Sequence, residues 1–161
     1  MKTLYLVRHA KSSWEFDVID HERPLNERGL NDAPLVAKKV ADVMERPDLI
    51  MSSDALRAKT TALFFAAAFN ISEKDIQLEH ELYDFAGMQL VAVIRDCPND
   101  IDCFMVFGHN NAMTNFVNTY GDRDIDNVAT SQFTAIAFDI DNWRDLKQGK
   151  TIFKCTPKEL K

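Results

Sequence analysis

Residues 3–10, Thr-Leu-Tyr-Leu-Val-Arg-His-Ala, decide the fold, because a short apolar run ends abruptly at two chemically active side chains. An uninterrupted apolar run of this length is typical of a strand that is buried on both faces. Two similar runs, at 48–51 and 102–107, also end in polar clusters, and segments with helical spacing of apolar residues separate the three runs. This alternation predicts an α/β fold, a three-layer sandwich around a mostly parallel central sheet.

The remaining elements are predicted from periodicity and from capping residues. A helix is expected from Asn26, its cap, to about residue 44, with a kink or a second start at Pro34. A second helix is expected over 55–69 with Asp54 as its cap. Residues 10–25 show no period and are predicted to form a long loop, which in small domains is usually functional. We also expect a strand at 76–82, helices at 87–97 and 112–120, and an antiparallel strand pair at 133–140 and 151–155.

Composition limits the classes of protein to which the chain can belong. It has 161 residues, 46% apolar and 27% charged, without internal repeats, which predicts one globular domain over 1–161. The net charge of −6 argues against nucleic acid or a membrane surface as the partner. No signal-peptide core precedes Arg8, and the three cysteines (Cys97, Cys103 and Cys155) lack CxxC spacing. We therefore expect a cytoplasmic monomer with reduced cysteines.

Polar clusters stand at the ends of three predicted parallel strands. They are Arg8 with His9, residues 52–54 with Arg57, and His109 after Gly108. Ligands of such sheets bind at the carboxyl ends of the strands, so these side chains are predicted to converge. Two arginines suit a phosphoryl group, and a neutral histidine can carry that group covalently. The four histidines lack the HxH and HExxH spacings of metal sites, so no metal and no other cofactor is expected.

These residues also carry a family resemblance. Arg8-His9-Ala10 resembles the first signature of the histidine phosphatase superfamily, and residues 52–60, Ser-Ser-Asp-Ala-Leu-Arg-Ala-Lys-Thr, resemble its second motif. Residues 106–109, Val-Phe-Gly-His, resemble its late histidine motif. Residues 23–29, Arg-Pro-Leu-Asn-Glu-Arg-Gly, and 156–160, Thr-Pro-Lys-Glu-Leu, are similar to the small phosphohistidine phosphatases of the SixA type. The resemblance implies a phosphoglycerate-mutase-like fold and a phosphatase acting on phosphohistidine in a protein.

The resemblance also implies roles for single residues. His9 would be the nucleophile that becomes phosphorylated, and Arg8, Arg57 and His109 would line the phosphate pocket. Arg23 and Ser12 would contact phosphate or substrate, although a surface role for Arg23 and a loop role for Ser12 are open alternatives.

The proton donor of the larger relatives has no clear counterpart in this chain. Asp84 aligns best with it and Glu81 lies nearby, although either carboxylate could be only a loop acid. A phosphohistidine needs little protonation of its leaving group, so a weak donor suits such a substrate.

Two other functions remain open. Residues 58–108 have no room for the helical lid of larger relatives, and this open pocket favours a bulky phosphoprotein. A broad-specificity phosphomonoesterase on small phosphate esters is the first alternative. A non-catalytic phosphate-binding module is the second.

Overall fold

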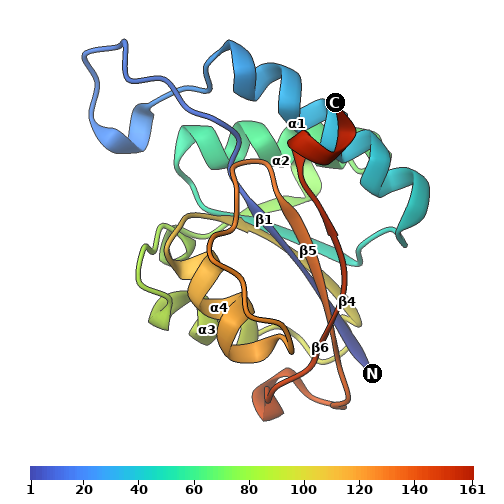
Figure 1. Cartoon of the computed structure of the whole chain (residues 1–161). Coiled ribbons are helices and arrows are strands. Elements are labelled where there is room, and N and C mark those ends of the chain that lie inside the picture. Colours follow the sequence, from blue (N-terminus) through green and yellow to red (C-terminus); the bar gives the residue numbers. More distant parts are fainter.

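The computed structural model describes residues 1–161 and has one six-stranded sheet with helices on both faces (Figure 1). The strand order is β3-β2-β4-β1-β5-β6, in which the first four strands are mutually parallel and β5 is antiparallel to both of its neighbours. The strands are β1 (Lys2–Arg8), β2 (Leu49–Ser52), β3 (Ile76–Leu78), β4 (Cys103–Gly108), β5 (Phe133–Phe138) and β6 (Lys150–Cys155).

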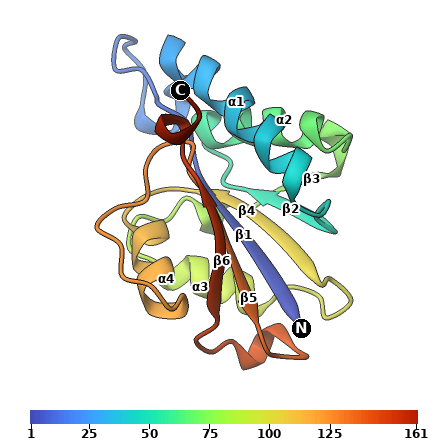
Figure 2. The same ribbon diagram turned by 45° about the vertical axis from the view of Figure 1, so that its right-hand side comes forward.

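Two helices cover each face of the sheet. Helices α1 (Glu27–Val43) and α2 (Leu56–Ala68) pack on one face, and α3 (Met88–Arg95) and α4 (Ala112–Tyr120) pack on the other. Figures 1 and 2 show the sheet running between the two helix pairs. This arrangement confirms the predicted three-layer α/β sandwich with a mostly parallel sheet.

The central strands supply both halves of the core by strict alternation. Leu4 and Leu6 of β1 face the α3–α4 layer, whereas Tyr5 and Val7 face the α1–α2 layer. Successive side chains of a strand point to opposite faces, so a strand buried on both sides must be apolar throughout. This is why residues 4–7 are all buried.

Three expectations about individual elements need correction. Of the two outcomes expected at Pro34, the second helix start is wrong: α1 is one continuous helix with Pro34 inside it, because its buried face packs along α2 and compensates for the backbone hydrogen bond that proline removes. Asp54 does not cap α2: Ala55 is the first flanking residue, and its N–H donates to the Ser53 hydroxyl. The predicted strand at 76–82 ends at Leu78 and continues as a 3-10 turn over His80–Leu82.

The long loop between β1 and α1 is ordered by contacts with its neighbours. Its ends are joined by a bridge between Ser12 and Leu25, and it contains a 3-10 turn over Asp20–Glu22. A Cβ at Gly29 would clash with the Lys11 carbonyl oxygen, so glycine lets α1 approach the loop closely. The loop thereby lies at the carboxyl edge of the parallel strands.

All three cysteines are buried, and none is paired in a disulfide. No helix here combines the length and the hydrophobicity that crossing a membrane requires.

Candidate active site

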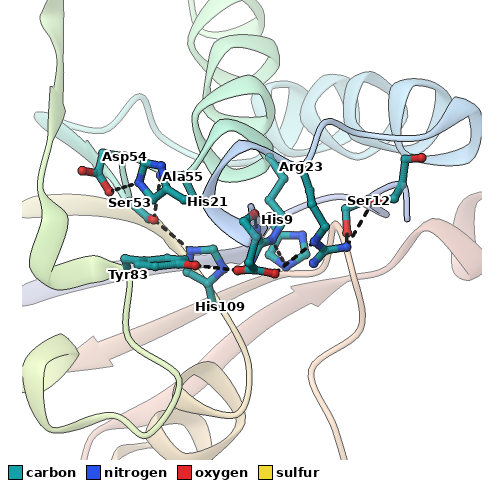
Figure 3. A network of polar contacts seen from close by, with 12 residues as sticks. His9, Ser12, His21, Arg23, Ser53, Asp54, Ala55, Tyr83 and His109 are labelled. Carbon is teal, nitrogen blue, oxygen red and sulfur yellow. Dashed lines mark hydrogen bonds and ion pairs between the residues drawn. The ribbon is translucent and has the colours of Figure 1, made fainter. Parts of the chain in front are cut away.

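The register of three neighbouring strands brings the catalytic candidates together. Arg8 pairs with Gly108 across β1 and β4, so His9 and His109 leave the sheet side by side. Their ring centroids lie 5.2 Å apart. Ser53 leaves the adjacent β2, and its N–H donates to the Phe107 carbonyl (2.9 Å). The prediction that side chains meet at these strand ends agrees with the structure (Figure 3).

His9 is held in the orientation that a nucleophile requires. The ring is buried, and Nδ1 lies 2.7 Å from the Ala10 carbonyl oxygen, which can only accept, so Nδ1 carries the proton. The free electron pair is therefore on Nε2, toward which Arg57 Nε donates at 3.4 Å. Burial, together with the charges of Arg57, Arg8 and Arg23, lowers the pKa of His9 to about 3. The ring is neutral near neutral pH and is available to attack an electrophile.

His109 is also buried and neutral. Its Nε2 lies 2.8 Å from the Ser53 hydroxyl, and its buried Nδ1 has no hydrogen-bond partner. Burial and the neighbouring His9 lower the pKa of His109 to about 2. Buried polar atoms are nearly always paired in folded proteins, so an unpaired ring nitrogen beside His9 marks a place where a ligand atom belongs.

Arg8 and Arg57 give the pocket its positive charge. The Nη1 of Arg8 donates to the Val128 carbonyl (2.8 Å), while its buried Nε has no partner. Arg57 is fully buried, and its side chain reaches both His9 and the loop residue Asp20. Two guanidinium groups next to two neutral imidazoles form a site suited to an oxyanion.

Asp20, which the sequence reasoning did not single out, occupies the mouth of this pocket. Its carboxylate accepts hydrogen bonds from Arg57 Nη2 (2.9 Å), Arg23 Nε (3.0 Å) and the Tyr83 hydroxyl (2.5 Å), and its carbonyl accepts from Arg57 Nη1 (2.7 Å). Burial raises the pKa of Asp20, but the hydrogen bonds from Tyr83 and Arg57 outweigh burial and hold the pKa well below its ordinary value. Both terminal nitrogens of Arg57 are therefore already engaged by Asp20, Nη2 by its carboxylate and Nη1 by its backbone carbonyl.

The two lesser binding candidates, Arg23 and Ser12, lie together at the edge of the pocket. Arg23 Nη1 donates to the Ser12 hydroxyl (2.9 Å), and its guanidinium carbon lies 3.4 Å from the centre of the Trp14 ring. Arg23 is buried, so the alternative of a solvated surface charge does not describe it. Through its bond to Asp20, Arg23 also belongs to the charge network of the pocket.

The two proton-donor candidates lie in different surroundings. Asp84 accepts from the backbone N–H groups of Ala86 (3.1 Å), Gly87 (3.0 Å) and Leu90 (3.0 Å). These bonds anchor the start of α3, so Asp84 has a structural role that requires no proton transfer. Glu81 is exposed and its carboxylate makes no hydrogen bond. The one carboxylate that lies within the arginine network is that of Asp20.

Comparison with known proteins places this geometry in context. The sequence profile of the histidine phosphatase superfamily (branch 1) matches residues 4–115. An uncharacterized chloroplastic protein of Arabidopsis thaliana is 34% identical over 118 residues, which are 68% of this chain and 54% of that protein. Phosphoserine phosphatase 1 of Hydrogenobacter thermophilus is 33% identical over 109 residues, 62% of this chain and 49% of that protein. The chain thus spans about half the length of these two relatives.

A solved structure matches the chain over almost its whole length. It is that of an Agrobacterium tumefaciens protein named as a phosphohistidine phosphatase SixA, which is 27% identical, with a TM-score of 0.82. The match covers 97% of this chain and 98% of that protein.

Proposed function

The chain belongs to the histidine phosphatase superfamily, and from this premise we propose that it is a phosphatase that hydrolyses phosphohistidine on a protein substrate. The observation that carries the proposal is the arrangement around His9. Its Nδ1 is anchored on the Ala10 carbonyl, and its Nε2 lies beside the guanidinium group of Arg57. This is the arrangement that transfer of a phosphoryl group to an imidazole requires.

The reaction proceeds in two displacements at phosphorus. His9 Nε2 attacks, its bond to phosphorus forms, and the bond between phosphorus and the substrate imidazole breaks; the leaving imidazole takes its proton from solvent. Water then attacks the phosphorylated His9, inorganic phosphate leaves, and neutral His9 is restored. Arg8, Arg57 and His109 stabilise the charge on the phosphoryl oxygens in both steps.

The leaving group favours phosphohistidine over a phosphate ester. The carboxylate of Asp20 in the pocket is held ionised by hydrogen bonds from Tyr83 and Arg57. The carboxylate of Asp84 accepts hydrogen bonds from backbone N–H groups at the start of α3. Neither carboxylate is set up to give a proton to an alkoxide. An imidazole accepts a proton from water near neutral pH, so it leaves without such a donor.

The surroundings of the pocket favour a macromolecular substrate. Between α2 and β4 the chain forms only the short strand β3, 3-10 turns and α3, and no helical lid covers His9. The loop that carries Asp20 also exposes large apolar side chains: Trp14 is 77% and Ile19 is 67% exposed. Such side chains next to a pocket are suited to contact with another protein.

The proposed chemistry uses only the residues of the chain. Arg8 and Arg57 neutralise the phosphoryl charge, a task for which other phosphoryl-transfer enzymes use a divalent ion. We expect hydrolysis to continue at full rate after treatment with a chelator. Loss of activity that added metal restores would contradict this part of the proposal.

The substrate test compares a histidine-containing protein phosphorylated with phosphoramidate against phosphoserine and p-nitrophenyl phosphate. We expect kcat/KM for the phosphohistidine protein to exceed that for phosphoserine by ~10²-fold or more, because the pocket offers no proton donor to an alkoxide leaving group. p-Nitrophenolate leaves without a proton, so p-nitrophenyl phosphate is the control ester that the enzyme should still hydrolyse. Equal or faster turnover of phosphoserine would overturn the assignment in favour of a phosphomonoesterase, the activity of the relative from Hydrogenobacter thermophilus.

The nucleophile is tested in the same assay. His9→Ala should abolish turnover and leave the circular dichroism spectrum of the protein unchanged. Rapid quenching of the wild type should trap an acid-labile phosphoryl group on His9. Phosphate binding without any covalent label would instead indicate a non-catalytic binding module, and a label on His109 would make the assignment of His9 wrong.

A further inference from the structure

A second group of histidines lies outside the phosphate pocket. His21 follows Asp20 in the 3-10 turn of the long loop, Asp54 lies in the turn between β2 and α2, and His80 lies in the 3-10 turn after β3. The three side chains come from segments far apart in the sequence, and nothing in the proposed phosphatase mechanism uses them. Their meeting at the rim of the pocket is therefore unexplained by the phosphoryl chemistry.

Both imidazoles point a ring nitrogen at the same carboxylate. His21 Nε2 lies 2.8 Å from Asp54 Oδ1, and His80 Nδ1 lies 3.0 Å from both Asp54 oxygens. Figure 3 shows the bond between His21 and Asp54 beside Tyr83. One nitrogen or oxygen atom from each residue lies within 4.8 Å of the other two, so three donor atoms converge on one point.

These three donors match a transition-metal site in kind and in spacing. Imidazole nitrogens and a carboxylate oxygen bind Zn²⁺ at about 2.0–2.1 Å, which places tetrahedral ligand atoms roughly 3.3 Å apart. The observed separations are 2.8–3.0 Å to Asp54 and within 4.8 Å between the two imidazole nitrogens, so rotations of the partly exposed side chains can bring the three atoms to that spacing. Metal ligands must be deprotonated, so an ion that binds here takes the place of the protons that the two ring nitrogens share with Asp54.

Access and charge also allow an ion to bind there. The His80 side chain is 72% exposed, and those of His21 and Asp54 are each 31% exposed, so an ion reaches the cluster from solvent. Arg57, which bonds the residue next to His21, is paired with the carboxylate of Asp20, which offsets its positive charge. The carboxylate of Asp20 therefore cancels part of the repulsion that Arg57 would exert on a cation at this rim.

We propose that His21, Asp54 and His80 form a binding site for a divalent transition metal of the Zn²⁺ type, with the remaining coordination positions filled by water. The site is separate from His9 and His109 and is independent of the proposed phosphatase reaction. An ion bound there would join the loop that carries Asp20 to the turn that begins α2.

The test is isothermal titration calorimetry of the metal-free protein with ZnCl₂. We expect one site in the wild type, and binding at least ~10-fold weaker in Asp54→Asn and in His80→Ala. Asp17→Asn, which changes an exposed carboxylate of the same loop, is the matched control and should bind as the wild type does. Equal Zn²⁺ affinity in all four proteins, or no binding in the wild type, would overturn the proposal.

A second measurement separates this site from the catalytic histidines. Imidazole resonances in NMR spectra should shift for His21 and His80 when Zn²⁺ is added, and those of His9 and His109 should stay in place. His9→Ala should retain the Zn²⁺ site. Loss of Zn²⁺ binding in His9→Ala, with binding unchanged in His80→Ala, would place the metal in the catalytic pocket and make the proposal wrong.

Discussion

Arg57 connects the nucleophile to the loop at the mouth of the pocket. Its Nε reaches His9, while its two terminal nitrogens hold the carboxylate and the carbonyl of Asp20. A lysine ammonium has its donors on a single nitrogen, so it cannot reach His9 and both oxygens of Asp20 as the wide, planar guanidinium group does. We expect Arg57→Lys to lower kcat/KM by ~10²-fold or more, the usual effect of losing a charged contact in the transition state. Arg95→Lys, at the exposed end of α3, is the control for the substitution itself, and a near-wild-type rate in Arg57→Lys would contradict the proposed role.

Asp20 competes with the substrate for the same guanidinium group. Because Asp20 engages both terminal nitrogens of Arg57, a phosphoryl group that binds them must displace the carboxylate or tolerate its charge. Asp20→Asn removes the like charge and keeps a hydrogen-bond acceptor. We expect the variant to bind inorganic phosphate at least ~10-fold more tightly, because unfavourable like-charge contacts in an interface are worth several kcal/mol.

The measurement for Asp20 is inhibition of turnover by inorganic phosphate, with Asp17→Asn as the control from the same loop. If phosphate binds more weakly to Asp20→Asn than to the wild type, Asp20 positions Arg57 and does not compete with the substrate.

At the scale of the elements, Asp84 is expected to act on α3 rather than on the reaction. Three backbone N–H groups at the start of the helix depend on its carboxylate. We expect Asp84→Asn to lower the free energy of unfolding by about 1 kcal/mol, the usual size of a lost helix cap, and to change the cleavage of phosphohistidine little. Urea denaturation checks the first effect, with Glu81→Gln as a control that removes an unbonded carboxylate. A ~10²-fold loss of turnover with unchanged stability would instead restore Asp84 as the proton donor.

Most elements were predictable because their signals are local. The apolar run 3–7 required a doubly buried strand, and the Asn26 side chain caps α1 by accepting from the Gly29 N–H, as expected. The cap of α2 was predicted wrongly because Ser53 and Asp54 are both good capping residues, and only the tertiary structure draws Asp54 away toward His21. The continuity of α1 through Pro34 likewise depends on packing against α2, which no local pattern encodes.

The sheet topology explains which part of the site could be predicted. Parallel strands end at one edge, so the meeting of His9, His109 and Arg57 followed from their positions: the histidines directly follow strands, and Arg57 lies in the first turn of the helix after β2. Asp20 and His21 lie in a loop without periodicity, and their positions depend on contacts with α2 and with the turn after β3. The one sequence signal for Asp20 was its spacing from Arg23. Residues three apart can form an ion pair within one helical turn, as these two do.

The two buried histidines should make the stability of the whole molecule depend on pH. The folded-state pKa of His9 is about 3 and that of His109 about 2, whereas an unfolded histidine has a pKa near 6.5. Unfolding below pH 6.5 therefore takes up protons that the native state excludes. The free energy of unfolding is fully maintained above pH 6.5 and falls as the pH drops toward 3.

The expected slope between pH 4.5 and 6 is up to ~1.4 kcal/mol per pH unit for each of these histidines. Urea denaturation at several pH values in this window measures it, and most of the window lies above about pH 5, below which the carboxylates of Asp20 and Asp54 begin to take up protons in the unfolded chain. His9→Asn removes one of the two groups and should reduce the slope by up to ~1.4 kcal/mol per pH unit, whatever its effect on the absolute stability. An unchanged slope in His9→Asn would mean that the His9 ring titrates as freely in the folded protein as in the unfolded chain. A nucleophile that is neutral because it is buried could not behave in that way.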